Sequence, residues 1–152
     1  MVKLYDLILD TEKHPVLAEK HLYETDQILL NSPQLITDFV NKSVELFRKA
    51  EEYLYMIAFD NALQVQGVFE IGHGIVNGCM VGEREIFIRA LLCGATYIVV
   101  IHNHPSGILK PSTEDKQCCN KIKKTGDILG IKLIDFLIIN KDYFSFKEAD
   151  MI

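Results

Sequence analysis

Apolar residues gather along the chain in unbroken runs of strand length. Residues 97–101 consist only of Tyr, Ile and Val, which is typical of a strand buried on both faces. Other apolar runs border turn-forming residues such as Asp60-Asn61, and these predict further strands. The predicted strands cover residues 53–59, 63–71, 97–101, 131–139 and 143–146, with 2–9 as a weaker candidate and another short strand expected within 72–78.

Three other segments have the spacing and end signals of helices. Residues 33–50 follow Ser32, a good N-cap, and begin with Pro33, which favours a first turn. Residues 83–93 precede Gly94, and residues 112–129 precede Gly130, as expected where helices end. The sum predicts an α/β fold, with a mixed β-sheet flanked by about three helices.

Length and composition predict one soluble domain. The chain has 152 residues, of which 49% are hydrophobic and 24% charged. Residues 32–152 carry the clear pattern and are predicted to form the domain, while 1–31 form an N-terminal extension that is hard to interpret. No apolar run approaches the roughly 20 residues of a membrane-spanning helix. The first residues do not resemble a secretory signal, so we expect a cytoplasmic protein without membrane contact.

Charge and cysteine usage narrow the function classes. The net charge of −5 argues against broad nucleic-acid binding, which normally needs a basic face. The four lysines between 116 and 124 lie on a predicted helix and read as a solvated face. The four cysteines form no Cys-x-x-Cys pair, so we expect reduced thiols that serve mainly in packing.

The candidate chemistry follows the most buried predicted strand. His102 and His104 lie two residues apart, so on an extended chain their imidazoles point the same way and can meet one metal ion. Asp115 follows eleven residues after His104, in the first turn of the next predicted helix. Two histidines and one carboxylate are a ligand set of catalytic zinc sites, with water in the fourth position.

Asp115 also has a purely structural interpretation. With Ser112 as N-cap, Asp115 occupies the third helical position, where an acid favours the helix dipole. The two interpretations are compatible, because one segment can cap the helix and still aim a carboxylate at the preceding loop. His14, His21 and His73 have no ligand partners at recognisable spacing and are interpreted as surface or structural residues.

The same residues resemble a known motif. His102-x-His104-Pro105, followed after six residues by Ser112-x-x-Asp115, resembles the signature of the JAMM metalloproteases, also called JAB or MPN. The flanks, from Gly82-Glu83-Arg84-Glu85 to Tyr143-Phe144-Ser145-Phe146, resemble the RadC-like branch of that family over residues 33–147. The resemblance implies an MPN/JAB architecture, which is cytidine deaminase-like.

The resemblance also implies roles for particular residues. One Zn²⁺ per chain would be held by His102, His104 and Asp115, and Ser112 would donate its hydroxyl to a developing oxyanion. An upstream glutamate would act as the general base, and the matching position is Glu52, eight residues before an aspartate as in the family pattern. Glu51 is the neighbouring rival, while the remaining candidates, Glu70, Glu83 and Glu85, are interpreted as structural or surface residues.

Two functions from different classes follow. The first is a zinc-dependent amide hydrolase, a metallopeptidase or isopeptidase acting on a protein or peptide. The second is a non-catalytic or DNA-repair-associated protein, because RadC-like proteins carry that label. Full-length members resemble this chain preceded by a helix-hairpin-helix DNA-binding region, which is not visible in residues 1–31. DNA is therefore a candidate partner that the charge does not favour.

Two further expectations complete the sequence-based picture. Several strands suggest an exposed sheet edge, so a homodimer is a candidate assembly. Phe136 follows Asp135 where the RadC-like branch often has a histidine, and this departure puts substrate handling in question if that histidine contributes near the site.

Overall fold

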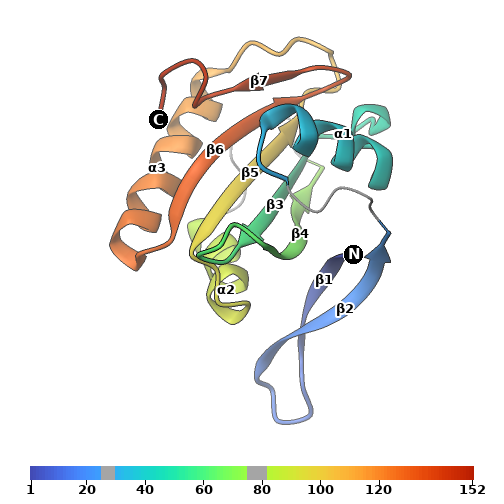
Figure 1. Ribbon diagram of the computed structural model, residues 1–152, viewed down its shortest axis with the longest axis vertical. Helices are drawn as coiled ribbons and strands as arrows, with labels where there is room; N and C mark the ends of the chain where they lie inside the picture. Colours follow the sequence, from blue (N-terminus) through green and yellow to red (C-terminus); the bar gives the residue numbers. More distant parts are fainter. Residues whose placement is uncertain (25–29, 75–81) are drawn as a thin grey trace.

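The computed structural model describes residues 1–24, 30–74 and 82–152. In these residues a seven-stranded sheet carries helices on both faces (Figure 1). The strands, in chain order, are β1 (Val2–Leu9), β2 (Pro15–Tyr23), β3 (Tyr53–Phe59), β4 (Val65–His73), β5 (Tyr97–Asn103), β6 (Lys132–Ile139) and β7 (Tyr143–Ser145). The helices are α1 (Pro33–Ser43), the 3₁₀ turn Leu46–Arg48, α2 (Glu83–Leu92) and α3 (Thr113–Leu129).

The sheet is mixed, as predicted. Its order is β2-β1-β4-β3-β5-β6-β7, with β5 and β6 parallel, β1 and β4 parallel, and the other neighbours antiparallel. The α3 crossover joins β5 to β6. The predicted α/β class with a mixed sheet and three flanking helices is therefore confirmed.

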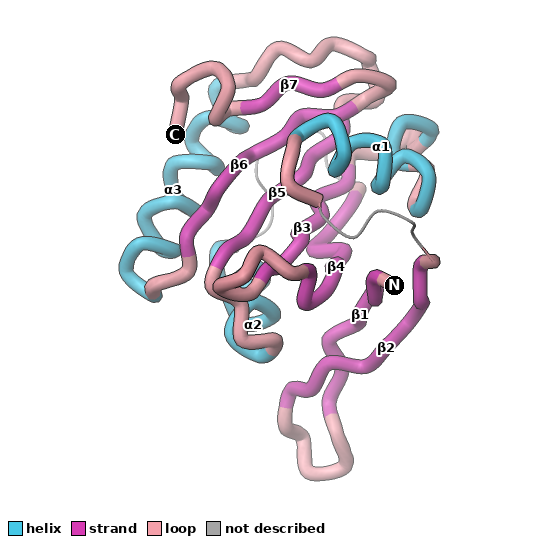
Figure 2. Tube along the Cα trace, in the orientation of Figure 1, coloured by secondary structure: helices cyan, strands magenta, loops and turns pink. Residues whose placement is uncertain are grey.

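The pleat of the central strands divides the interior into two cores. Met56 and Val100 point to the core covered by α2 and α3, whereas Ile57 and Val99 point to the core covered by α1. Figure 2 shows α1 on one face of the sheet and the other two helices on the opposite face. By the same alternation, residue 102 belongs to the face covered by α3.

The first helix is shorter than predicted. It ends at Ser43, because Glu45 adopts a left-handed backbone with φ of 50°. Asn41 Oδ1 accepts a hydrogen bond from Phe47 N–H at 3.2 Å, so a side chain takes over from the helical ladder. The apolar pattern in the sequence extends beyond the helix to Phe47, because the 3₁₀ turn that follows also buries an apolar side chain, Leu46.

The other two helices have the predicted ends. Ser112 caps α3, and Gly130 ends it with a φ of 72°, a conformation that glycine adopts without strain. The strand expected within 72–78 falls partly outside the described residues, and its first two positions belong to β4.

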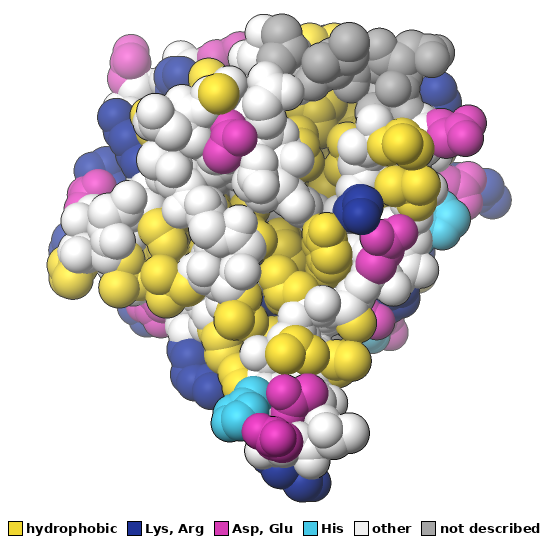
Figure 3. All heavy atoms as spheres, turned by 60° about the horizontal axis from the view of Figure 1, so that its bottom comes forward, with side chains coloured by type: hydrophobic (Ala, Val, Ile, Leu, Met, Phe, Trp, Pro, Cys, Tyr) yellow, Lys and Arg dark blue, Asp and Glu magenta, His cyan; other side chains and the backbone are white. Residues whose placement is uncertain are grey.

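The N-terminal segment forms a hairpin that extends the sheet. Residues 2–9 are a strand, as predicted, but β2 has no fully buried position, and the sequence pattern did not reveal it. Figure 3 shows acidic and histidine side chains together at the hairpin tip, with apolar side chains across the middle of the same face. At the tip His14 Nδ1 lies 3.5 Å from Asp10 Oδ2, so this histidine has a surface partner.

The cysteine expectation is partly wrong. Cys118 is disulfide-bonded, whereas Cys93 and Cys119 are free. Sequence spacing could not reveal this, because a disulfide depends on spatial approach rather than on distance along the chain.

In the described residues, no helix combines the length and apolar character that crossing a membrane requires.

Candidate metal centre

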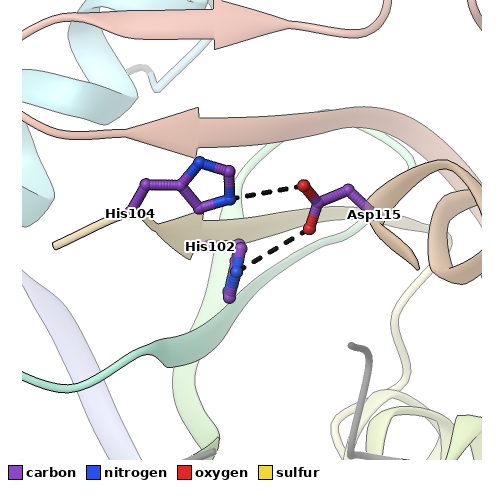
Figure 4. Close-up of side chains that lie close together, drawn as sticks. All are labelled: His102, His104 and Asp115. Atoms are coloured by element: carbon purple, nitrogen blue, oxygen red, sulfur yellow. Dashed lines mark ion pairs between the residues drawn. The ribbon is translucent and has the colours of Figure 1, made fainter. Parts of the chain in front are cut away.

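Two imidazoles and one carboxylate converge where β5 ends and α3 begins (Figure 4). His104 Nε2 lies 3.3 Å from Asp115 Oδ2, and His102 Nε2 lies 3.7 Å from Asp115 Oδ1. One potential ligand atom from each residue lies within 4.8 Å of the others, and no second group of this kind occurs in the described part of the chain. The three residues could therefore hold a metal ion.

The local fold explains why these side chains meet. His102 is the sixth residue of β5 and points to the α3 face, in phase with Ile98 and Val100. His104 follows the end of the strand, and its backbone N–H donates to Ile139 O at 3.2 Å, which keeps the chain beside β6. Asp115 comes from the first turn of α3, whose N-terminus faces the same point.

Backbone contacts fix the orientation of each ligand. His102 Nδ1 lies 3.1 Å from Tyr53 O, and His104 Nδ1 lies 2.6 Å from Ile108 O. Because only a protonated Nδ1 can donate to these carbonyls, both neutral rings present an unprotonated Nε2. Asp115 Oδ2 accepts a hydrogen bond from Ser112 N–H at 2.7 Å, which orients the carboxylate. This outer arrangement is typical of histidine metal ligands.

The electrostatics of the group are those of a cation site. Burial lowers the pKa of His102 against the opposing effect of Asp115, while contact with Asp115 raises the pKa of His104. Burial alone would raise the pKa of Asp115, but His104 and the bonds with Ser112 bring it below its ordinary value. Asp115 is thus favoured in its ionised form beside two imidazole nitrogens, an arrangement suited to a metal cation.

The two Nε2–Oδ separations, which run to different oxygens of Asp115, are of the size found between zinc ligands. Zinc bonds of about 2.0–2.2 Å in a tetrahedron place ligand atoms about 3.3–3.6 Å apart. The two Nε2–Oδ separations of 3.3 and 3.7 Å are close to these values. Two imidazoles and a carboxylate also match the ligand types of catalytic zinc sites.

Glu52 lies beside the group of potential metal ligands, whereas Glu51 has an exposed side chain. Glu52 Oε2 lies 3.6 Å from His102 Nε2, and its side chain is 21% exposed. Burial raises the pKa of Glu52, opposed by His104 and assisted by Asp115. Glu51 is exposed. Glu52 therefore contacts the group of potential metal ligands, while the side chain of Glu51 is exposed to solvent.

The other glutamates considered from sequence have structural partners or lie in the first turn of α2. Glu70 Oε2 accepts from Tyr55 Oη at 3.0 Å, and its Oε1 lies 2.9 Å from His73 Nδ1. Glu85 pairs with Arg84 at 3.0 Å, and Glu83 is in the first turn of α2. These contacts agree with the structural interpretation of His73 and of these glutamates.

Ser112 borders the group through its capping role. Its Oγ accepts a hydrogen bond from Asp115 N–H at 3.0 Å, and its own N–H donates to the Asp115 carboxylate. These reciprocal bonds form a capping box, so the structural interpretation of Asp115 holds alongside the metal-binding one. The Ser112 side chain also helps to lower the pKa of Asp115, so its hydroxyl lies within reach of the carboxylate.

The sequence did not indicate Asn103, which lies beside the site. It did draw attention to Phe136, which lies in the core. Asn103 bonds to the backbone on both sides of Glu52, which no sequence pattern indicated because the partners are about fifty residues away. Phe136, at the position where the RadC-like branch often has histidine, is buried and packs on Phe146 with ring centroids 4.9 Å apart. A core aromatic therefore occupies that position.

Comparison with known proteins shows the family of this chain. The RadC-like JAB domain family matches residues 30–151. A UPF0758 protein of Thermotoga maritima is 32% identical over 121 residues, covering 74% of this chain and 54% of that protein. A UPF0758 protein of Clostridium novyi is 35% identical over 128 residues, covering 84% and 55%. One of Clostridium tetani is 40% identical over 103 residues, covering 67% and 45%.

The chain spans about half the length of the curated relatives it matches. The family match includes the ligand group, Glu52, Ser112 and every element from α1 to β7. The mixed sheet with helices on both faces is also the architecture expected of a JAB domain. The chain therefore belongs to the RadC-like JAB domain family.

Proposed function

We propose that this chain is a zinc-dependent hydrolase of the JAMM type, cleaving an amide bond in a protein or peptide. The observation that carries the proposal is the Glu52 carboxylate lying 3.6 Å from His102 Nε2, beside the group formed with His104 and Asp115. Ligands alone would suit a structural metal. A further carboxylate beside them supplies the group that hydrolysis needs.

His102, His104 and Asp115 would hold the ion. Zinc, when bound, supplies a Lewis acid that lowers the pKa of a water molecule from about 16 to roughly 7 in favourable sites. Glu52 would accept the proton of the attacking water and deliver it to the leaving amine nitrogen as the carbon–nitrogen bond breaks. Such acid–base help is typically worth about 10²–10⁴-fold in rate.

Ser112 would stabilise the transition state. Its hydroxyl stands at the N-terminus of α3, where the helix already provides positive potential. Because its oxygen is anchored by Asp115 N–H at 3.0 Å, the hydroxyl is held in place and can donate to a developing oxyanion.

Metal content is the first test. Purified protein should hold about one zinc per chain by elemental analysis, as expected for one set of three protein ligands, and His104→Ala should hold far less. His14→Ala is the matched control, because His14 lies at the hairpin tip and pairs only with surface acids. Equal and negligible zinc in the wild type and in His104→Ala would sink the proposal.

Adjacent glutamates provide the second test. Glu52→Gln should keep its zinc and lose about 10²–10⁴-fold in turnover of a quenched fluorescent peptide library. Glu51→Gln removes the same charge one residue earlier, from an exposed side chain, and should retain activity. A zinc-loaded protein whose activity does not distinguish the two variants would not use Glu52 as its base.

DNA binding is the alternative from a different class. The lysines of α3 are its nearest candidate surface, but Lys123 lies 3.3 Å from Asp127, and the net charge of the chain is −5. A gel-shift titration at several salt concentrations tests it. Tight binding with a steep salt dependence would favour this alternative over the hydrolase.

A further inference from the structure

Asn103 lies between His102 and His104 in the sequence. Its side chain is buried, and only 1% of the residue's surface is exposed. Because side chains alternate along a strand, its carboxamide points away from the direction taken by His102. It is therefore no member of the ligand group. A fully buried carboxamide needs partners for both its oxygen and its nitrogen.

Both partners lie on the segment that carries Glu52. Asn103 Oδ1 accepts a hydrogen bond from Tyr53 N–H at 2.6 Å, and Asn103 Nδ2 donates to Glu51 O at 3.0 Å. The Glu51 carbonyl belongs to the peptide unit before Glu52, and the Tyr53 N–H belongs to the unit after it. One side chain thus holds both peptide units that flank Glu52.

Two other bonds complete the arrangement. Gly74 N–H donates to Glu52 O at 2.9 Å, and His102 Nδ1 bonds to Tyr53 O at 3.1 Å. The backbone of residues 51–53 is therefore tied to side chains of residues 102 and 103. The direction of the Glu52 side chain depends on these two peptide units, so its distance to His102 depends on Asn103.

The strand ladder shows why a side chain is needed here. β3 and β5 pair from Phe59 with Tyr97 up to Leu54 with His102, and the regular pairing stops there. On its other side β5 still pairs with β6, where Asn103 lies opposite Ile139. Its carboxamide reaches back to β3 and replaces one further pair of backbone bonds.

We propose that Asn103 is a positioning residue that fixes the Glu52 carboxylate against the metal group, an inference that rests on the proposed function. Removing its carboxamide frees the segment that carries Glu52 while the ligand side chains stay in place. A displacement of about 1 Å can cost on the order of 10²-fold in rate. We expect kcat to fall about 10–100-fold with KM nearly unchanged.

The test uses cobalt-substituted protein, so it does not depend on knowing the substrate. The visible spectrum of bound Co²⁺ is recorded against pH for the wild type, Asn103→Ala, Glu52→Gln and the double variant. Asn103→Ala should move the pH profile in the same direction as Glu52→Gln but less far. The double variant should match Glu52→Gln alone, because Asn103 acts through that carboxylate.

Two further variants keep the test decisive. Asn103→Asp retains the acceptor for Tyr53 N–H but loses the donor to Glu51 O, so it should also move the profile and can be used if Asn103→Ala does not fold. Asn41→Ala is the matched control, since Asn41 also bonds two backbone groups, Asn140 O and Phe47 N–H, from α1. It should leave the cobalt profile unchanged.

The outcomes separate the two proposals. If the wild type binds no cobalt, or Glu52→Gln leaves the profile unchanged, the proposed function fails. If Glu52→Gln moves the profile but folded, loaded Asn103→Ala does not, or its effect simply adds to that of Glu52→Gln, the role of Asn103 is overturned. If neither Asn103 variant folds, Asn103 is structural and the positioning role is likewise rejected.

Discussion

Two regions of the molecule each bury an aspartate, and they use it differently. Asp115 in the first turn of α3 is 7% exposed, and Asp135 in β6 is 5% exposed. The Asp135 carboxylate accepts three internal hydrogen bonds, from Ser145 Oγ at 2.6 Å and from the N–H groups of Phe136 and Lys147 at 2.7 and 3.1 Å. Its acceptor capacity is largely used by the fold.

Asp115 accepts one backbone hydrogen bond, from Ser112 N–H, and its remaining capacity faces two imidazoles. The net pKa shifts are opposite. Burial raises the pKa of Asp135 despite its three donors, whereas His104 and Ser112 outweigh burial and lower that of Asp115. Two aspartates that are buried to a similar extent can therefore have different roles. The partners show that Asp135 joins β6 to the turn after β7, while Asp115 can bind a cation.

Asp135→Ala should give the largest loss of stability. It leaves the buried N–H of Phe136, the N–H of Lys147 and the Ser145 hydroxyl without their acceptor. At about 1–3 kcal/mol for each unsatisfied group, the free energy of unfolding should fall by about 3–5 kcal/mol in urea titrations. Asp127→Ala, at an exposed pair with Lys123, should change it by about 0.5 kcal/mol or less. A loss at Asp135 no larger than that of the control would contradict the structural role.

Asp115→Asn should have the opposite effect, with little loss of stability but a large loss of zinc affinity. The side-chain oxygen of Asn can still accept from Ser112 N–H, so unfolding of the metal-free protein should change by less than about 1 kcal/mol. Zinc affinity should fall by more than about 100-fold, because even partners outside the ligand shell are worth about 10–100-fold. Competition with a chromophoric chelator measures this loss. Asp135→Asn is the control and should keep its zinc affinity; equal losses in both variants would break the comparison.

Sequence pattern was sufficient for the elements whose burial is simple. β5 and β6 are nearly continuous apolar runs, and α3 carries both of its end signals. β2 was missed because most of its positions are exposed, so its place depends on pairing with β1 rather than on its own pattern. The first helix was extended too far because the apolar spacing does not show the left-handed turn at Glu45.

The sequence also predicted some residues of the candidate site but not others. His102, His104 and Asp115 lie close together in sequence, and their spacing and family resemblance indicated a metal site. Glu52 needed the family pattern, and Asn103 was missed. Its bonds to Glu51 and Tyr53 exist only because β3 lies beside β5, a neighbourhood that no local pattern encodes. Side chains that bond to distant backbone require the sheet order to be known first.

The pH dependence of stability gives a finer test of Asp135. Its pKa is raised above the ordinary value of 3.8, so between these two values the folded protein binds more protons than the unfolded chain. Stability must then increase as pH falls through this window, and decrease as pH rises through it. Asp135→Asn lacks this titration. Urea titrations of both metal-free proteins from neutral to acidic pH should show the wild type gaining stability relative to the variant as pH falls, by less than the loss caused by Asp135→Ala. A relative loss on acidification would contradict the raised pKa.

The smallest expected effects come from the serine beside each aspartate. Ser112→Ala removes the acceptor of Asp115 N–H, and Ser145→Ala removes a donor to the Asp135 carboxylate, so each should cost about 1 kcal/mol in unfolding free energy. Only the second should depend on pH in the window of Asp135. Ser145 stabilises the ionised carboxylate, so its loss raises the pKa of Asp135 further and extends the window in which acidification stabilises the fold. The pKa of Asp115 lies below the ordinary value, so its titration falls below the window of Asp135, and the cost of Ser112→Ala should stay constant across that window. Two serine variants with the same pH dependence would show that the two aspartates are not used as differently as their hydrogen bonds indicate.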